Sequence, residues 1–215
     1  MSLAASDADD FLARAARHLR RDPPSSAQPR SDPKGDHSHD FPNEPEIAPD
    51  AAKPAAVLVP MVMRESGVTV LFTQRATGLR SHSGQISFPG GKIDDTDASP
   101  IAAALREAEE EIGLDRRLVE PLGYVDAYLS STGYLVMPVV ATVSPDLALT
   151  LNPVEVAEVF EVPLGFLMDA VNHQIHSREW RGRMRRYYAI PFGERYIWGV
   201  TAGIVRNLYE RLYAA

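Results

Sequence analysis

The sequence predicts an α+β fold in which a mixed β-sheet is sandwiched between α-helices. The composition, with 45% hydrophobic and 24% charged residues in 215, is that of a globular protein with one sizeable core. Many short β-branched and apolar runs indicate strands, whereas only two or three segments have helical spacing. These strands and helices do not alternate regularly, which argues against a parallel βαβ architecture.

The first predicted element is a helix over residues 7–21, because Phe11, Ala15 and Leu19 are spaced to share one face. Eight of the 17 prolines lie between residues 23 and 54, in a stretch that offers few apolar side chains. We therefore expect three parts: an N-terminal helix (1–22), a disordered Pro-rich linker (23–54) and a compact domain (55–215). Because residues 1–50 contain so few apolar side chains, we expect that their deletion leaves the fold largely intact.

The compact domain is expected to begin with a β-hairpin, in which residues 65–67 form the turn. A short strand then precedes a glycine-rich loop and a helix, and a second helix ends the chain. The predicted strands are Ala55–Met63, Val68–Phe72, Gln85–Phe88, Gly123–Tyr128, Tyr134–Thr142, Val156–Val162, Gln174–Glu179 and Arg185–Ile190, and the predicted helices are Ser99–Ile112 and Gly199–Tyr213.

Charge and residue usage exclude several classes of protein. The 22 basic and 29 acidic residues give a net charge of −7, which argues against a dedicated nucleic-acid binder. The absence of cysteine excludes disulfide scaffolds, thiol catalysis and Cys-ligated zinc, and makes the cytoplasm the expected location. Residues 1–7 lack the features of a secretory signal, and turn residues break the longest uncharged run (127–145), so no membrane association is expected. The sequence does not indicate an oligomeric state.

The helix predicted over residues 99–112 has well-marked ends. Ser99 is a suitable N-cap, Pro100 occupies a position where a missing N–H costs nothing, and Gly113 can end the helix in the left-handed conformation. At about 100° per residue, Ile101, Ala104, Leu105, Ala108 and Ile112 form an apolar stripe for the core.

A cluster of carboxylates occupies a separate face of the same helix. Glu107, Glu110 and Glu111 lie within about 60° of one another, whereas Glu109 points away and is expected on the surface. Like charges at this spacing destabilise a helix, so something should compensate them. Divalent cations such as Mg²⁺ prefer oxygen ligands and bind beside phosphates. Taken alone, the pattern is more typical of a solvated acidic face with Arg106 as its partner.

The context favours the metal-binding interpretation. Gly84, the loop Phe88–Gly91 and the segment Arg106–Leu114 (REAEEEIGL) together resemble the Nudix hydrolase signature, a glycine loop followed by a helix that bears glutamates. The resemblance implies a Nudix fold and metal-dependent hydrolysis of a nucleoside diphosphate derivative, with Glu107, Glu110 and Glu111 as metal ligands. The loop is one residue longer than in the general pattern, and Asp97 or Ala98 stands where that pattern has a glutamate.

The segment Leu71–Gly91 is similar to the motif of the coenzyme A pyrophosphatase subfamily, whose loop has the same extra residue. This resemblance implies hydrolysis of coenzyme A to adenosine 3′,5′-bisphosphate and 4′-phosphopantetheine with Mg²⁺ or Mn²⁺. Two alternatives stay open: a Nudix enzyme for ADP-ribose or a dinucleotide, which should not need this segment, and a non-catalytic binding module, which should have lost its carboxylates. The substrate-binding residues expected from the segment are Arg75, Arg80, Gly84, Gly90, Gly91 and Lys92.

The roles of Arg106, of the general base and of a basic run near the C-terminus are predicted less specifically. Arg106 is expected to orient a carboxylate or to brace the glycine loop rather than to touch the substrate. The general base is a helix glutamate or one from a loop elsewhere, and the segment after Asn152 offers Glu155 and Glu158. The basic run Arg178–Arg186 is interleaved with aromatic residues. The acidic net charge favours an exposed hairpin, and the alternatives are a contact to a nucleic acid or to the 3′-phosphate of an adenosine.

Overall fold

The computed structural model describes residues 3–24, 34–35, 49–78, 82–180 and 183–214. Its helices are α1 (Leu3–His18), α2 (Pro100–Ile112), α3 (Leu164–Leu167) and α4 (Val200–Leu212), and 3-10 turns lie at Pro49–Ala51, Arg116–Leu118 and Ala170–Asn172. The strands of the large sheet are β1 (Lys34–Gly35), β2 (Lys53–Arg64), β3 (Gly67–Arg75), β4 (Ile86–Ser87), β5 (Gly90–Lys92), β6 (Val119–Tyr124), β7 (Tyr128–Leu129), β8 (Tyr134–Val143) and β9 (Val156–Pro163). A smaller antiparallel sheet contains β10 (Gln174–Trp180), β11 (Arg183–Phe192) and β12 (Arg195–Trp198).

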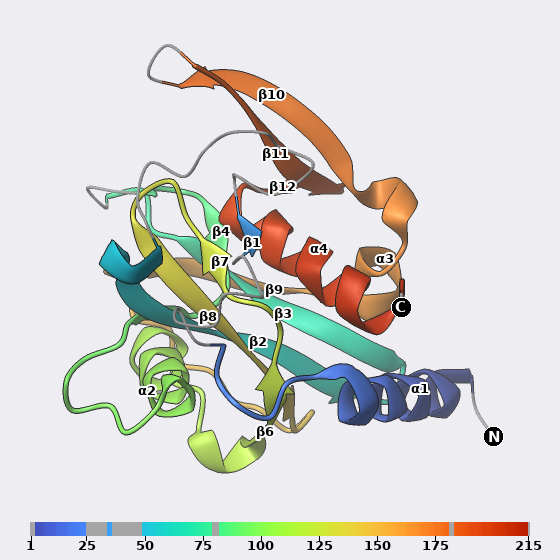
Figure 1. The fold of residues 1–215 in the computed structure, drawn as a ribbon. Coiled ribbons are helices and arrows are strands. Elements are labelled where there is room, and N and C mark those ends of the chain that lie inside the picture. Colours follow the sequence, from blue (N-terminus) through green and yellow to red (C-terminus); the bar gives the residue numbers. More distant parts are fainter. Residues whose placement is uncertain (1–2, 25–33, 36–48, 79–81, 181–182, 215) are drawn as a thin grey trace.

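The large sheet is mixed, as predicted. In the described part of the chain its main order is β1-β7-β8-β2-β3-β4, with β5 paired to β2, β6 to β8 and β9 to β3. The pairs β2–β8 and β1–β7 are parallel, and the remaining pairs are antiparallel. Helix α2 covers one face, and α4 lies on the other face between the large and small sheets (Figure 1). The α+β prediction is therefore confirmed.

Alternation along β3 separates the two faces of the sheet. Val70 and Phe72 belong to the core cluster that contains α4, whereas Leu71 belongs to the cluster that contains α2. This follows from the period of two along a strand, which sends successive side chains to opposite faces. The same alternation positions the residues at the end of β3, where the functional residues lie.

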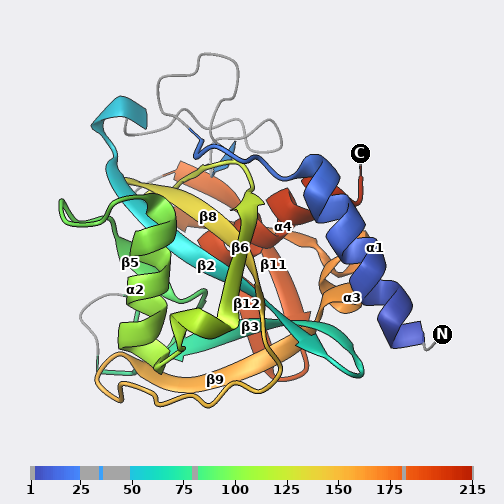
Figure 2. The ribbon, with the colours of Figure 1, turned by 90° about the horizontal axis from the view of Figure 1, so that it is seen from below.

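The N-terminal helix is present, but its bounds and its packing against the core differ from the expectation. Helix α1 spans Leu3–His18 rather than 7–21, and the side chains of Phe11 (0% exposed), Ala15 (2%) and Leu19 (9%) are buried in the main core. Figure 2 shows α1 packed along the body of the domain. These three apolar side chains thus share one face of the helix, and that face is part of the core.

The predicted linker also changes. Lys34–Gly35 pairs with β7, and β2 begins at Lys53 rather than at residue 55. Most of the remainder of the predicted linker lies outside the described residues.

Other differences concern short elements. The strand predicted at 123–128 is replaced by β6 and the two-residue β7, and β5, β12 and α3 were not predicted. These elements are too short for a periodic signal to develop. Among the described residues, no helix is both long and apolar enough to cross a membrane.

Candidate active site

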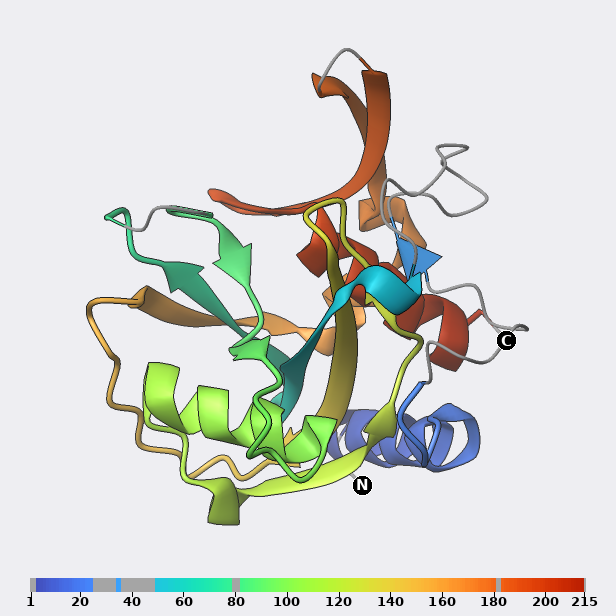
Figure 3. The same cartoon turned by 60° about the vertical axis from the view of Figure 1, so that its left-hand side comes forward.

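Helix α2 begins and ends where the sequence predicts. The Ser99 side chain accepts a hydrogen bond from the Ala102 backbone N–H at 3.1 Å, and Gly113 adopts φ 66° at the C-terminal end. The helix packs its small residues against β2, so its carboxylate face lies beside β5 and the end of β3 (Figure 3). Glu109 is exposed and pairs with Arg116, which confirms its expected place on the surface.

Glu111 is the most buried carboxylate of the helix, with 3% of its surface exposed. Its Oε2 accepts a hydrogen bond from the Gly90 backbone N–H at 3.2 Å, and its Oε1 lies 3.6 Å from a terminal nitrogen of Arg75. Burial raises the pKa of Glu111 to about 7, although the Gly90 N–H and Arg75 both act to lower it. Two residues of the segment Leu71–Gly91 therefore contact this carboxylate directly.

Glu107 lies against the glycine loop. A Cβ placed on Gly91 would come within 2.6 Å of its carboxylate, so only glycine leaves room for the group. Gly90 is constrained differently, because it has φ 152° and its Cβ would lie 2.4 Å from the carbonyl oxygen of Ala56. Burial raises the pKa of Glu107 as well, against the lowering effect of Arg106.

Arg106 braces the loop and the carboxylates, as expected. Its guanidinium donates to both oxygens of Asp97, at 3.1 and 2.9 Å, and to the carbonyl oxygen of Lys92 at 3.2 Å. It also donates to Glu107 at 3.0 Å and to Glu110 at 3.1 Å. Its hydrogen bonds lower the pKa of Asp97. Asp97 thus supplies the acidic partner in the position where the general pattern has a glutamate, which the sequence had left open between Asp97 and Ala98.

The structure separates the two candidates for the general base. Glu155 lies close enough to Glu107 and Glu111 for its charge to raise the pKa of both, and it accepts a hydrogen bond from the Asn152 side chain at 3.2 Å. Glu158 instead forms an ion pair with Arg195 at 2.5 Å, and this hydrogen bonding lowers its pKa. The expectation that places Glu158 at the reaction centre is not supported, because its carboxylate is held by β12 of the small sheet.

The other predicted residues are distributed around this centre. Gly84 has φ 70° and lines a pocket next to β4, and the side chain of Lys92 is exposed. Arg80 lies outside the described residues. Gln74 and Arg195, which sequence reasoning missed, line the same pocket as Gly84, and no local motif marks them.

The carboxylates suit a hard divalent cation by their chemistry. Glu107 and Glu111 are oxygen donors with raised pKa values, held in a partly desolvated cluster whose like charges a cation would offset. In the described ranges, however, no group of three or more acidic or histidine side chains is already arranged to hold a metal ion. The side chain of Glu110 is 56% exposed and paired with Arg106, so it is not part of a converged set.

The glycine loop beside a helix whose Glu111 is buried, on a mixed sheet between helices, is the arrangement that the resemblance to hydrolases of pyrophosphate bonds implies. The family model described as NUDIX domain matches residues 52–180. The chain therefore belongs to the Nudix hydrolase family, whose members generally use divalent metal ions.

Two proteins described as Nudix hydrolase NudL agree with this assignment. A protein of Photorhabdus laumondii described as uncharacterized Nudix hydrolase NudL is 41% identical over 172 residues, covering 80% of this chain and 91% of its own length. The NudL protein of Escherichia coli K12 is 45% identical over 154 residues, covering 72% of this chain and 80% of its own. Among solved structures, the Nudix hydrolase RenU of M. smegmatis is 25% identical, with a TM-score of 0.46 over 55% of this chain and 74% of that one.

Proposed function

We propose that this enzyme hydrolyses the diphosphate of coenzyme A or of its derivatives, yielding adenosine 3′,5′-bisphosphate and 4′-phosphopantetheine. The observation that carries the proposal is the position of the segment Leu71–Gly91. Its similarity to the coenzyme A pyrophosphatase motif covers Arg75 and Gly90, and both contact the buried Glu111. The segment that specifies the substrate class is thus physically joined to the carboxylates of the reaction centre.

In this proposal the glutamates of α2 bind metal ions and Arg75 binds the substrate. Glu107 and Glu111 would hold Mg²⁺ or Mn²⁺, and Glu110, which the motif also implies as a ligand, would join them by leaving its pair with Arg106. One to three such ions would neutralise charge on a diphosphate and lower the pKa of bound water. Arg75 is placed to bind a phosphate oxygen, because its guanidinium already lies at the carboxylate cluster and presents several donors.

Proton transfer is assigned to Glu155. Its carboxylate belongs to the same cluster and is held by Asn152, so it can accept the proton of an attacking water. Arg106 does not contact the substrate, since its donors already bind Asp97, Glu107 and Glu110. Gly90 and Gly91 keep the loop close to the carboxylates.

The expected substrate is a small nucleotide, and the expected location is the cytoplasm. Neither a nucleic acid nor a membrane is proposed as a partner.

A substrate panel tests the proposal. We expect kcat/KM with Mg²⁺ or Mn²⁺ to be highest for coenzyme A and low for ADP-ribose, which lacks the pantetheine arm. Dephospho-coenzyme A lacks the 3′-phosphate; loss of a charge-assisted contact should reduce kcat/KM by roughly 10- to 150-fold. ADP-ribose as the best substrate would refute the coenzyme A assignment and leave the carboxylate centre as that of another Nudix pyrophosphatase.

Variants then test the centre itself. Glu107→Gln should lower kcat by at least about 10²-fold, because it removes a charge while keeping the shape of the side chain. Glu155→Gln should also lower kcat, whereas Glu158→Gln should leave kcat within about threefold. Equal losses in the last two variants would contradict the choice of Glu155.

A further inference from the structure

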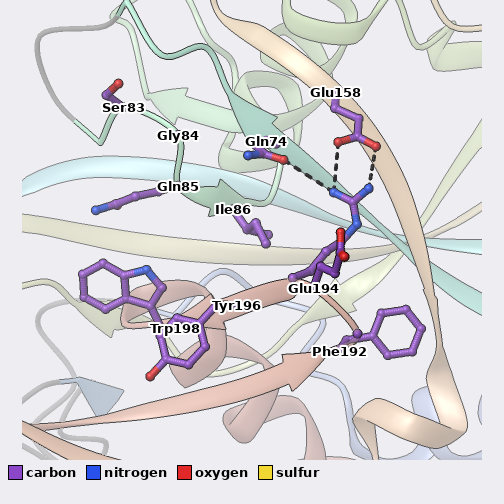
Figure 4. Close-up of a pocket in the computed structure, with 12 residues that line it drawn as sticks. Gln74, Ser83, Gly84, Gln85, Ile86, Glu158, Phe192, Glu194, Tyr196 and Trp198 are labelled. Carbon is purple, nitrogen blue, oxygen red and sulfur yellow. Dashed lines mark hydrogen bonds and ion pairs between the residues drawn. The ribbon is translucent and has the colours of Figure 1, made fainter.

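The pocket that Gly84, Gln74 and Arg195 line lies on the other side of β3 from the carboxylate helix. It has a volume of about 680 Å³ and lies between the β3–β4 segment and the turn between β11 and β12. Figure 4 shows Gly84, Gln85 and Ile86 on one side, Tyr196 and Trp198 on the opposite side, and Glu158 at one end. Glu158 forms an ion pair with Arg195. A pocket of this size can hold a drug-sized molecule or a large part of a nucleotide.

The wall from the small sheet is aromatic and held in place. Tyr187 meets the Trp198 ring edge-on at 5.5 Å between ring centres, and the guanidinium of Arg178 stands over the same indole at 5.5 Å. His176 meets the Tyr196 ring at 6.2 Å, also edge-on. Planar rings fixed in this way suit a flat ligand, because they offer large contact area without loss of side-chain freedom.

The charges of the pocket disfavour a phosphate. Among the described residues, its lining contains the carboxylates of Glu158 and Glu194 and one cationic side chain, Arg195. That guanidinium already donates to both oxygens of Glu158, at 3.0 and 2.5 Å, and approaches the amide oxygen of Gln74 at 3.5 Å. The remaining polar groups include the amides of Gln74 and Gln85, which can donate and accept hydrogen bonds at the edge of an uncharged ring.

The pocket and the reaction centre are connected through β3. Gln74 lines the pocket and the next residue, Arg75, reaches Glu111, so the two sites lie on opposite faces of one strand end. A ligand that occupies both must carry a sizeable group attached to its diphosphate and must pass around this edge of the sheet.

We propose that this pocket binds the nucleobase of the substrate, stacked on Trp198 and Tyr196, while the diphosphate lies at the carboxylates. This inference rests on the proposed function for its ligand, since the nucleotide half of coenzyme A carries an adenine. The flat aromatic wall favours the base over the flexible pantetheine arm, and the excess of carboxylates keeps phosphates outside.

Tryptophan fluorescence tests the inference directly. The chain has two tryptophans, so Trp180→Phe leaves Trp198 as the single tryptophan, whose emission is excited selectively over that of the tyrosines. Adenosine, which carries no phosphate, should quench this emission in a saturable manner, whereas pantetheine should not. Quenching by pantetheine alone, or by neither compound, would overturn the assignment.

Kinetics of full-length variants give a second measurement. Trp198→Leu should raise KM for coenzyme A by about 5- to 150-fold, the range expected for one lost base-stacking contact, and leave kcat within about twofold. Tyr196→Ala should act in the same direction and removes a side chain that is 41% exposed, so it remains informative if Trp198→Leu does not fold. The matched control is Ile175→Ala in strand β10 of the same small sheet, which removes an exposed side chain that is not among the residues lining the pocket.

The outcomes separate this inference from the proposed function. Saturable quenching by adenosine supports the pocket assignment even if ADP-ribose is the better substrate, in which case the coenzyme A proposal alone fails. Unchanged KM in both aromatic variants, together with efficient hydrolysis of coenzyme A, would refute the pocket assignment and retain the proposed function.

Discussion

The substitution Gly91→Ala separates the activity of this enzyme from its stability. The added Cβ would lie 2.6 Å from the Glu107 carboxylate, against an ordinary contact of at least 3.4 Å. The obstacle is the end of a flexible side chain rather than backbone, and the φ of Gly91 lies outside the left-handed region. The carboxylate therefore moves by about 0.8 Å, whereas β5 keeps its place.

The expected consequence is a catalytic defect in a folded protein. A displacement of about 1 Å between a catalytic group and the reacting atoms can lower kcat by about 10²-fold. Replacing glycine by alanine also reduces the conformational freedom of the unfolded chain, which stabilises the folded protein by about 0.4–1 kcal/mol. Because this gain offsets part of any strain from the added methyl group, Tm should change by no more than about 4 °C.

Gly90→Ala is the matched control. Its Cβ would meet backbone atoms, the carbonyl oxygen of Ala56 at 2.4 Å and the Cα of Val57 at 2.6 Å, at φ 152°. This variant should lose at least about 2 kcal/mol of stability, or roughly 4–8 °C in Tm. Metal-dependent turnover and thermal unfolding of both variants would be measured. Wild-type kcat in Gly91→Ala, or equal Tm losses in the two variants, would refute the assigned position of Glu107.

Three further outcomes are expected. Glu111→Gln should lower kcat by at least about 10²-fold, while Glu109→Gln on the outer face of the same helix should leave turnover within about twofold. Phe11→Ala should lower Tm by roughly 6–20 °C, because it empties a fully buried site, whereas the exposed neighbour in Leu12→Ala should cost under about 4 °C; similar losses would contradict the packing of α1. Burial lowers the pKa of His173, so its contribution to stability should be complete above pH 6.5 and decline below it. The raised pKa of Glu111 acts in the opposite direction over the same range, so the two proteins are compared: in urea unfolding, the stability of the wild type relative to His173→Gln should fall between about pH 7.5 and about pH 5.5.

The ends of helix α2 could be predicted because their signals are local. Ser99 and Gly113 act through hydrogen bonds to residues a few positions away, so their roles can be read from spacing alone. The carboxylate face follows from the helical period for the same reason. The partner of Arg106 could not be chosen in advance, because the path of the loop decides whether Asp97 or Ala98 faces the guanidinium.

The N-terminal helix shows how averaging can hide a signal. Residues 1–50 as a whole are poor in apolar side chains, and this average predicted an independent segment. The spacing of Phe11, Ala15 and Leu19 nevertheless predicted one apolar face, and that face is buried. A face of three side chains is enough to join a core when its helix is long enough to present them together.

Glu155 and Glu158 could not be distinguished in the sequence because their positions depend on strand pairing. Gln74 pairs with Glu158 in β9, and the register shifts between Gln74 and Arg75. Such an irregularity changes which side chains share one face of the sheet, and no residue pattern in either strand predicts it.

The carboxylate helix combines a cost to folding with a use in catalysis. Glu107 and Glu110 each accept a hydrogen bond from the Arg106 guanidinium, so both have a direct cationic partner, which they share with Asp97. Glu111 is more deeply buried, and its neighbours are a backbone N–H and an arginine nitrogen at 3.6 Å, beyond hydrogen-bond distance. A carboxylate placed this way is poorly compensated by the protein alone. The residue with the least internal compensation is thus the one in direct contact with the segment that resembles the coenzyme A motif, which is where an external cation and a diphosphate would have the most effect.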